Sequence, residues 1–346
     1  MNGTSKIAVV ILNWNGEELL RKFLPSVVKH SSSENIRIIV ADNDSSDRSV
    51  ELLRHEFPSV EILELDENYG FAVGYNKALV QIQADYFVLL NSDVEVTDNW
   101  IGPCIRQFEN DDSLAVIQPK IMSYKEPDTF EYAGAAGGFI DKYGYPFCRG
   151  RILNRIEKDK GQYDRSTQIF WASGACMFIR ADRFKQVGGF DGDFWAHMEE
   201  IDLCWRLKSL GYKIIYEPKS TVYHLGGGTL SYGSPKKVCL NFRNNLWMLF
   251  KNLPKYEFKR KMTIRMILDG VAALKFLAGF HFRSFGAVFK AHYAFYRNFS
   301  ALKRKRKEIQ KNVVVNKQPE IYPKSVMWKF FIQNKNKFSE LNFNPK

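Results

Sequence analysis

The sequence is poor in cysteine and contains no cysteine pair with metal-binding spacing. Its five cysteines form no CxxC motif, and several stand in apolar runs. Scattered cysteines in odd number are typical of reduced, mostly buried thiols in a cytoplasmic protein, and they argue against a thiolate zinc site. Neither GxGxxG after the first predicted strand nor GxxxxGK followed by Ser or Thr occurs. The chain therefore lacks the phosphate cradle of dinucleotide-binding and P-loop proteins.

Long apolar runs are missing as well. A membrane-spanning helix needs about 20 apolar residues, and the nearest candidate, residues 262–282, is interrupted by Arg265, Asp269 and Lys275. The first residues, MNGTSKIAVVILNW, lack the long apolar region and the small-residue cleavage site of a secretory signal. We therefore expect a cytoplasmic protein without a spanning helix.

Charge is distributed unevenly along the chain. Residues 1–235 contain 25 Lys and Arg against 33 Asp and Glu, whereas residues 236–346 contain 25 Lys and Arg against 5 Asp and Glu. The second segment therefore has a net charge of +20, and we expect it to bind an anionic partner. The length suits about two units, and we expect a globular domain over residues 1–235 and a basic helical extension with a tail over residues 236–346.

Four apolar runs in the first hundred residues predict buried strands, and helical patterns separate them. The runs are residues 7–12, 36–41, 60–65 and 86–90. Apolar runs that alternate with helices predict an α/β fold with a mostly parallel central sheet flanked by helices. Ligands of such sheets bind beyond the carboxyl ends of the strands, where this sequence has clusters of Asn, Asp and Ser. Residues 119–170 have weak periodicity and predict an irregular segment or short antiparallel strands.

Three groups of residues can carry chemistry, and each also has an ordinary structural explanation. Asp93 follows a buried strand, where it either caps a turn or binds a hard cation together with a substrate phosphate. Glu199 and Glu200 begin a predicted helix, where they either complement the helix dipole or supply a general base. His224 precedes glycines that allow a phosphate to approach the backbone, although a lone histidine is more often structural.

Seven ordered segments resemble the glycosyltransferase family 2 enzymes of the GT-A fold, in particular the rhamnosyltransferase-like branch that builds bacterial surface polysaccharides. Each segment alone is a weak motif, but their order and spacing resemble the family from residue 6 to about residue 250. The segments are ILNWNG (11–16), VADNDSSD (40–47), ENYGFAVGYNKAL (67–79), LLNSDVEV (89–96), WASGACMFIR (171–180), GGFDGDFWAHMEEIDLCWRLKSLG (188–211) and VYHLGGGT (222–229). The resemblance implies a GT-A catalytic domain over residues 1–235.

The resemblance also implies a donor pocket along the strand ends. The turn from Asn13 to Asn15 would line the nucleotide pocket, and Asp42, with Asn43 beside it, would hydrogen-bond the nucleotide base. Further substrate-binding residues implied by the family are Asn68, Gly70, Asn76 and Ser92.

Two further motifs imply which residues bind the metal ion and which residue is the general base. Asn91-Ser92-Asp93 matches the family's DxD motif with Asn in first place, which implies that Asp93 binds Mg²⁺ or Mn²⁺ and that His224 completes the metal shell. The pair Glu199-Glu200 matches the ED motif with Glu in second place, which makes Glu200 the implied general base and Glu199 its backup. One base and one direct displacement imply inversion at the anomeric carbon.

The implied partners are a nucleotide-sugar donor and a glycan or lipid-linked saccharide acceptor, with rhamnose or another hexose as the transferred sugar. The family places Trp171, Ser173 and Gly174 beside the donor sugar and the acceptor. The residues expected on the acceptor side are Trp195, His197 and Met198.

Three other functions have less support. A nicotinamide oxidoreductase shares the alternating strands and helices but needs the missing glycine motif. A nucleic-acid-binding protein would suit the basic segment, but the aromatics of that segment stand among aliphatic residues rather than in a recognition module, so we expect no nucleic-acid partner. An inactive relative that binds a glycan or a nucleotide is compatible with the incomplete DxD motif.

The basic segment has the composition of an interfacial helix. Residues 262–300 interleave apolar and basic side chains, and residues 303–307 add five consecutive cations. Such a mixture binds anionic membrane surfaces. We therefore expect residues 236–346 to dock the protein peripherally on the inner face of the cell membrane. The alternative is that these helices pack on the first domain or form a homodimer.

Overall fold

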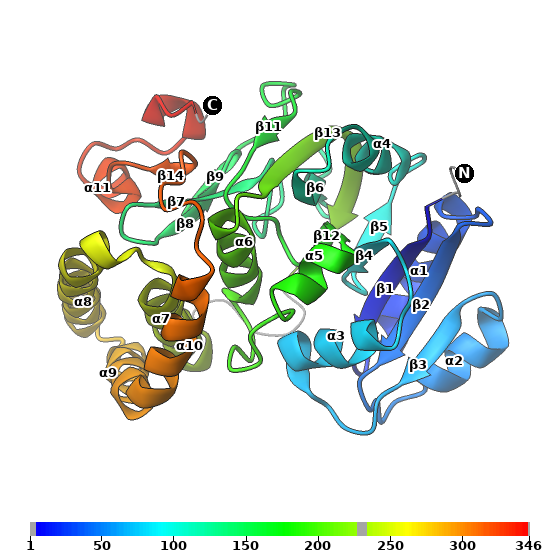
Figure 1. Cartoon of the computed structure of the whole chain (residues 1–346), viewed down its shortest axis with the longest axis horizontal. Coiled ribbons are helices and arrows are strands. Elements are labelled where there is room, and N and C mark those ends of the chain that lie inside the picture. Colours follow the sequence, from blue (N-terminus) through cyan, green and yellow to red (C-terminus); the bar gives the residue numbers. More distant parts are fainter. Residues whose placement is uncertain (1–4, 227–233, 345–346) are drawn as a thin grey trace.

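The computed structural model describes residues 5–226 and 234–344. Among these residues the main sheet has nine strands, in the order β11-β13-β6-β12-β4-β1-β2-β3 with β5 paired to β13 (Figure 1). The strands are β1 (Ile7–Asn13), β2 (Ile36–Asp42), β3 (Glu61–Glu64), β4 (Tyr86–Leu90), β5 (Val94–Val96), β6 (Leu114–Ser123), β11 (Thr167–Gln168), β12 (Cys176–Arg180) and β13 (Lys213–His224). Strands β1 to β4 pair in parallel, whereas β12 runs antiparallel to β4 and β6. The predicted α/β fold is confirmed, with a sheet that is mixed.

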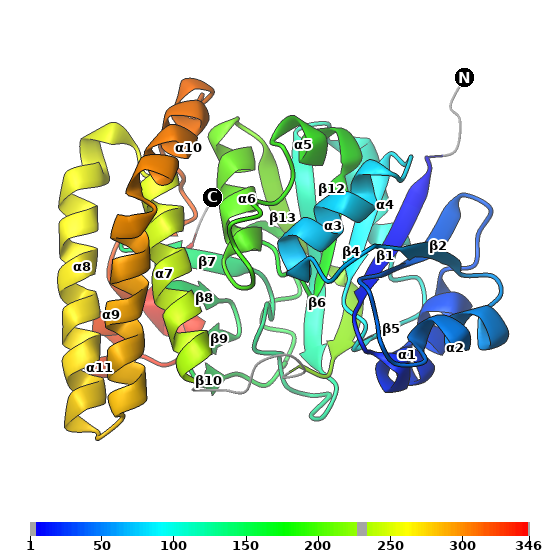
Figure 2. The same ribbon diagram turned by 90° about the horizontal axis from the view of Figure 1, so that it is seen from below.

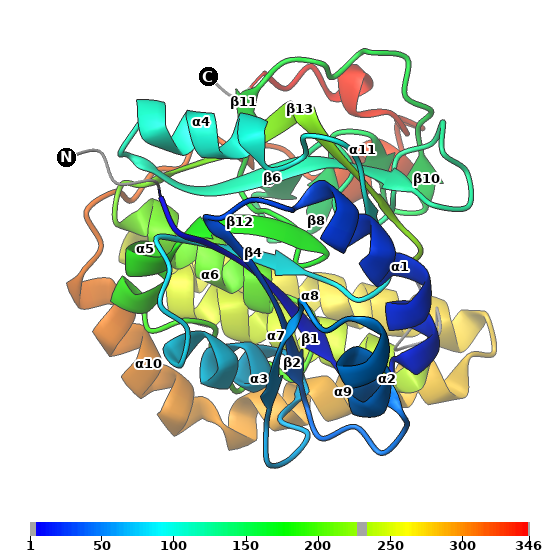
Figure 3. The same cartoon turned by 90° about the vertical axis from the view of Figure 1, so that its right-hand side faces the viewer.

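Alternate residues of β1 explain why helices cover both faces of the sheet. Val9 and Ile11 belong to one apolar core, and Ala8 and Val10 belong to the other. The first core is closed by α1 (Glu17–His30), α2 (Ser49–Glu56) and α4 (Gly102–Asn110), and the second by α3 (Gly70–Val80), α5 (Ala181–Gln186) and α6 (Glu199–Ser209). The two layers of helices can be followed in Figure 3. Because both faces are covered, the edge where the strands end is left for binding.

A second, smaller sheet forms within the segment of weak periodicity. Its strands are β7 (Gly138–Asp141), β8 (Pro146–Cys148), β9 (Arg151–Ile152), β10 (Arg155–Ile156) and β14 (Ile321–Tyr322). Strands β7 to β10 pair in antiparallel fashion, which confirms the expectation of short antiparallel strands. Strand β14 joins β7 in parallel. The end of the chain therefore returns to the middle of the molecule.

The basic segment folds into helices that pack at one end of the molecule. Figure 2 shows α7 (Pro235–Asn252), α8 (Lys255–Ala278) and α9 (Phe282–Arg297) side by side. They are followed by α10 (Phe299–Lys311), α11 (Val326–Phe331) and a short 3₁₀ helix (Phe338–Leu341). Leu246, Met248 and Leu249 of α7 are buried in the second core, and the ring of Phe338 lies 5.3 Å from that of Phe139. The helices thus share a core with the preceding residues, and the division at residue 235 stays a prediction.

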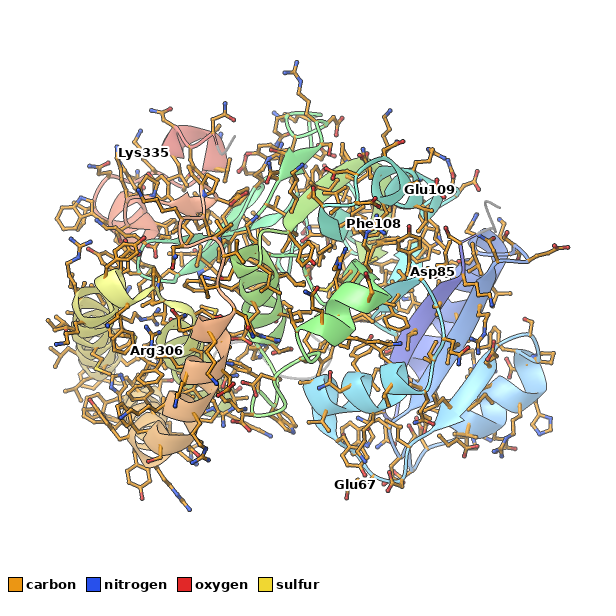
Figure 4. The ribbon with its side chains drawn as sticks, viewed as in Figure 1. Glu67, Asp85, Phe108, Glu109, Arg306 and Lys335 are labelled. Carbon is orange, nitrogen blue, oxygen red and sulfur yellow. The ribbon has the colours of Figure 1, made fainter. Side chains whose placement is uncertain are left out.

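Two of the five consecutive cations face the protein instead of the surroundings. Lys305 forms ion pairs with Asp191 and Asp193. Arg306 of α10, labelled in Figure 4, donates from Nη1 to the carbonyl of Phe250 at 2.6 Å. The prediction that residues 303–307 all face a membrane is therefore wrong for these two, because the carboxylates of Asp191 and Asp193 and the carbonyl of Phe250 near the end of α7 attract cations.

None of the helices in the two described ranges combines the length and the apolar character needed to cross a bilayer. All five cysteines are free thiols, and only Cys239 is not fully buried.

Candidate active site

Asn13 and Asp42 lie side by side at the ends of β1 and β2, where the strand register pairs them. Asn13 Nδ2 donates to Asp42 Oδ1 at 3.0 Å, and Ser45 donates to the same carboxylate from its backbone nitrogen at 2.9 Å and from its hydroxyl at 2.6 Å. Both Asn13 and Asp42 are buried. The Asp42 carboxylate is therefore fixed in orientation at the edge where the nucleotide pocket was expected.

Asn15 shapes the turns that follow β1 and β2. Its Oδ1 accepts from the backbone nitrogen of Ser46 at 2.7 Å, and its own backbone nitrogen donates to the Ser45 hydroxyl at 2.9 Å. Its φ of 49° lies in the left-handed region, which Asn tolerates better than most residues. The turn leaves Trp14 half exposed at the edge of the sheet, where its ring is free to stack on a flat group.

Asn43, Asn68 and Gly70 form one hydrogen-bonded turn. Asn43 Nδ2 donates to Asn68 Oδ1 at 3.0 Å and to the carbonyl of Gly70 at 3.2 Å. Gly70 has a φ of 68°, and a Cβ placed on it would lie 3.1 Å from Nε1 of Trp195. Only glycine suits this position, because the backbone is left-handed and Trp195 lies directly over it.

Asn76 of α3 is hydrogen-bonded to the backbone of Phe190. Its Nδ2 donates to the carbonyl of Phe190 at 2.8 Å, and its Oδ1 accepts from the nitrogen of Phe190 at 2.9 Å. Both polar groups of the side chain are thereby engaged with the loop that leads to Glu199 and Glu200. Asn76 therefore joins α3 to this loop.

The carboxylate of Asp93 and the imidazole of His224 meet beyond the ends of β4 and β13. Asp93 Oδ1 lies 3.1 Å from His224 Nε2, and Asn91 Nδ2 lies 3.5 Å from the same nitrogen. On the other side of the ring, Glu131 Oε2 lies 3.3 Å from His224 Nδ1. Burial lowers the pKa of His224, but the contacts with Asp93 and Glu131 outweigh it and raise the pKa to about 10.

This donor set fits a hard divalent cation. Carboxylate oxygens and an imidazole nitrogen suit Mn²⁺ once the cation displaces the proton from Nε2, and the Glu131 carboxylate lies at Nδ1 on the other side of the ring. In the part of the chain that the structure describes, no three His, Cys, Asp or Glu side chains converge on one point as a complete metal site. Two protein ligands suit a cation that takes its remaining ligands from a diphosphate and water. Gly227 and Gly228, expected near a phosphate, lie outside the described residues.

Glu199 and Glu200 begin α6 directly after an unusual turn. His197 and Met198 have φ values of 71° and 73°, so two successive residues other than glycine are left-handed. Glu199 is buried, Glu200 is partly buried, and each has one carboxyl oxygen, Oε2, without a hydrogen-bond partner among the described residues. Free carboxyl oxygens held at a helix start are available to accept a proton.

Burial raises the pKa of Glu200 to about 7. Burial and the neighbouring Glu200 raise the pKa of Glu199 well above its usual value. A general base works best with a pKa near the operating pH, so Glu200 has the proton affinity that this role needs.

Cys148 of β8 lies within electrostatic range of both Glu131 and Glu200. Burial raises the pKa of its thiol, the neighbouring Arg151 lowers it, and the charges of Glu131 and Glu200 raise it by smaller amounts.

The three residues expected next to the sugar, Trp171, Ser173 and Gly174, differ in how far they are buried. Trp171 is buried, its ring packs on Gly138, and its Nε1 donates to the carbonyl of Phe139 at 2.9 Å. Ser173 is buried too, and its hydroxyl accepts from the nitrogen of Ala175. Gly174 is partly exposed, and a Cβ there would lie 3.0 Å from the ring of Phe71. Trp171 and Ser173 thus contact the core, whereas Gly174 reaches the surface.

Trp195 is the aromatic residue that does reach the surface beside Gly70. It is 42 % exposed, and Lys236 Nζ lies 4.2 Å from its ring centroid. Ser92 lies next to the turn after β1, where a Cβ on Gly16 would be 3.9 Å from its hydroxyl oxygen.

Sequence reasoning missed two residues of this site. Glu131 comes from the segment of weak periodicity and has no motif around it. Asn244 lies in the middle of α7, and its Nδ2 donates to the carbonyls of Ala196 and His197 at 2.8 Å each. Asn244 stands among other polar residues of α7, such as Asn241 and Asn245, so the local pattern does not single it out.

Comparison with known proteins identifies the family of the chain. The glycosyl transferase family 2 model matches residues 8–188, just over half of the chain. The N-acetylglucosaminyl-diphospho-decaprenol L-rhamnosyltransferase of Mycobacterium tuberculosis is 24 % identical over 239 residues, which cover 64 % of this chain and 76 % of that protein. The rhamnosyltransferase WbbL of Escherichia coli is 24 % identical over 227 residues, which cover 63 % of this chain and 83 % of that protein.

The solved structure of GalNAc-T7 with UDP, GalNAc and Mn²⁺ resembles this one with a TM-score of 0.59 at 16 % identity. The match covers 74 % of this chain and 50 % of that one, so this chain spans half the length of that protein. At this identity the likeness shows the fold alone. The chain belongs to glycosyl transferase family 2, and its fold is the GT-A fold.

Proposed function

We propose that this chain is an inverting, metal-dependent glycosyltransferase that moves rhamnose or another hexose from a nucleoside-diphosphate donor to a hydroxyl of a glycan or lipid-linked saccharide. The observation that carries the proposal is the Glu200 carboxyl, which has an unpartnered oxygen and a pKa raised to about 7 by burial. Glu131, which contacts His224 beside Asp93, and Glu200 both act electrostatically on Cys148. The names of both relatives support a rhamnose donor, and the name of the Mycobacterium tuberculosis relative supports a lipid-linked acceptor.

Glu200 acts as the base. It takes the proton of the acceptor hydroxyl as that oxygen forms a bond to the anomeric carbon. The bond from this carbon to the diphosphate oxygen breaks on the opposite face, and its electron pair leaves with the nucleoside diphosphate. Attack on one face and departure from the other invert the anomeric centre, and no covalent enzyme intermediate is needed.

Asp93 and His224 would hold Mg²⁺ or Mn²⁺. When bound, the cation supplies Lewis-acid stabilisation of the negative charge on the leaving diphosphate. Glu131 holds the His224 ring for this purpose, since its carboxylate lies at Nδ1 while Nε2 faces Asp93. The fixed carboxylate of Asp42 would recognise the nucleotide base, and the Asn68–Gly70 turn would lie along the nucleoside and diphosphate.

A thermal-shift panel tests the donor and the cation together. A ligand that binds the native state raises the melting temperature by mass action. We expect UDP, GDP or dTDP, or one of their sugars, to raise the melting temperature of the wild type more with Mn²⁺ than with a chelator, and we expect Asp93→Ala to lose the difference. Absence of any shift with all nucleotides would contradict the proposal, and release of free sugar from the bound donor would exclude an inactive relative.

We propose further that α8, α9 and α11 dock on an anionic lipid bilayer. The large apolar and aromatic residues of α8 and α9 that are more than half exposed recur at helical spacing, so each set forms one stripe. They are Tyr256, Ile267, Val271 and Leu274 on α8, and Phe282, Phe289, Tyr293 and Tyr296 on α9. Phe280, between the two helices, is 78 % exposed. Lys275 of α8 lies 4.2 Å from the ring centroid of Phe331, which joins the exposed face of α11 to the same surface.

Basic residues border this apolar surface. Exposed cations on α8, α9 and α10 include Arg260, Arg283, Lys290, Arg297 and Lys303. Apolar and basic side chains on one surface are what an interfacial helix needs, and each cation contributes about 1 kcal/mol near an anionic leaflet. Residues 262–300 were expected to present their apolar side chains to the membrane, but Val288 of this segment is buried in the protein.

Co-sedimentation with liposomes tests the docking. We expect the wild type to bind anionic vesicles at low salt and to bind neutral vesicles weakly. Phe280→Ser with Phe282→Ser should reduce binding, whereas Val80→Ser, an equally exposed apolar site on α3, should not. A protein that ignores anionic vesicles at low salt, or that covers this face in a dimer during sedimentation equilibrium, would overturn the proposal.

A further inference from the structure

The turn before α6 adopts a conformation that its own residues do not favour. His197 and Met198 are both left-handed, although neither is glycine, asparagine or aspartate. Such residues persist only where the surrounding structure holds them, and they concentrate at functional sites. Met198 is the residue directly before α6, and the nitrogen of Asp202 donates to its carbonyl at 2.9 Å. The turn therefore sets the direction in which α6 and its first two carboxylates leave the loop.

Asn244 of α7 forms hydrogen bonds to the backbone of this turn. Its side chain is fully buried, and Nδ2 donates to the carbonyl of Ala196 and to the carbonyl of His197, each at 2.8 Å. Its Oδ1 accepts from Arg243 Nε at 2.8 Å. The carbonyls of Ala196 and His197 thus share one carboxamide, which belongs to a helix outside the residues matched to the family model.

The rest of the loop is anchored independently. Asn252 Nδ2 donates to Asp202 Oδ1 at 2.7 Å, and Lys251 forms ion pairs with Asp191 and Asp202. Arg206 donates to the carbonyl of Gly189 at 2.8 Å. These contacts fix the backbone before the turn, at Gly189 and Asp191, and after it, at Asp202. Loss of the Asn244 side chain would therefore loosen the turn itself, while α7 stays attached to α6.

We propose that Asn244 is a positioning residue for the transfer reaction. By binding the carbonyls of Ala196 and His197, it fixes the turn that sets the orientation of the Glu200 carboxylate. This inference rests on the proposed role of Glu200 as the base. A carboxamide nitrogen has two hydrogens, which is the number that two adjacent carbonyls require. Leucine has nearly the same volume and no donor, so it would leave both carbonyls without a partner. Displacement of a reacting group by about 1 Å costs about 10²-fold in rate.

The test compares Asn244→Leu with Asn245→Leu. Asn245 is the adjacent buried asparagine of α7, and it binds away from the turn, to the carbonyl of Gly144 and to Arg265. We expect Asn244→Leu to lower kcat by about 10²-fold with the donor KM nearly unchanged, and we expect Asn245→Leu to lose stability but to keep kcat in the folded protein. Donor-induced thermal shifts should be the same for both variants.

A double variant separates this inference from the function on which it rests. If Asn244 acts through Glu200, Asn244→Leu will lower kcat no further in a Glu200→Gln background. Equal losses in both backgrounds, or equal losses in Asn244→Leu and Asn245→Leu, would overturn the positioning role while leaving the base intact. Full transfer by Glu200→Gln alone would remove the base assignment and the positioning role together.

Discussion

Asp93 Oδ1 lies 3.1 Å from Nε2 of His224 at the edge of the main sheet. The two residues come from distant parts of the chain, and the parallel pairing of β13 with β6 carries His224 to this edge. If they hold a cation, Asp93→Ala and His224→Ala should both weaken donor binding and lower transfer by about two orders of magnitude or more, since charge stabilisation by the metal is worth several kcal/mol. Initial rates with added Mn²⁺ or a chelator measure this. Either variant keeping full activity in a chelator would show that the metal assignment is wrong.

Glu131→Gln should weaken the metal by about 10-fold to 100-fold, the usual effect of losing an outer-shell partner of a metal-binding histidine. The amide keeps the size of the side chain but removes the charge that contacts His224 Nδ1. Titration of Mn²⁺ in the presence of donor, followed by calorimetry, gives the affinity. Glu126→Gln, at an exposed carboxylate nearby, is the matched control. An unchanged affinity in Glu131→Gln would leave Glu131 with no role in the site.

Glu200→Gln should retain donor affinity and lose transfer by about 10²-fold to 10⁴-fold, the usual contribution of a general base. Glu199→Gln should have a milder effect, because Glu199 is the more deeply buried of the two carboxyls. Single-turnover rates with saturating donor separate transfer from binding. The reverse ranking of the two variants would move the base to Glu199.

The pH dependence of transfer should follow the ionisation of Glu200. Burial disfavours its charged form and raises its pKa to about 7. A base must be unprotonated, so the rate should rise with pH up to about 7 and then level off, falling about tenfold for each unit below the pKa. The pH profile of kcat measures this, with circular dichroism at each pH to show that the protein stays folded. A rate that is flat from pH 5.5 to 8 in the wild type is the outcome that this account does not allow.

Gly70→Ala should destabilise the protein more than Gly188→Ala. Both glycines are left-handed, with φ values of 68° and 75°, but a Cβ at Gly70 would lie 3.1 Å from Trp195, whereas a Cβ at Gly188 meets nothing within 4 Å. Gly188→Ala should therefore cost about 1–2 kcal/mol for the backbone alone, and Gly70→Ala about 1 kcal/mol more for the contact. Urea unfolding gives both values. Equal losses would mean that Trp195 moves away without cost.

The sequence by itself determined the sheet and the edge at which the site forms. Apolar runs that alternate with helical patterns leave few arrangements other than a covered sheet, and the carboxyl ends of its parallel strands share one edge. This places Asn13, Asp42 and Asp93 together without any knowledge of side-chain contacts. The start of the helix at Glu199 was equally readable, because acidic residues precede an apolar helical pattern and a stopping glycine, Gly211.

Only the tertiary structure decided which side chains face the site and which face the core. Trp171 is predicted beside the sugar but packs on Gly138, and Lys305 is predicted at a membrane but binds Asp191. Glu131 and Asn244 reach the site from segments whose local pattern carries no sign of chemistry. Local periodicity reports the burial of neighbours in sequence, whereas these roles depend on contacts between residues far apart in the chain. A buried charge or amide takes the partner that the fold brings to it, because leaving it unpaired is costly.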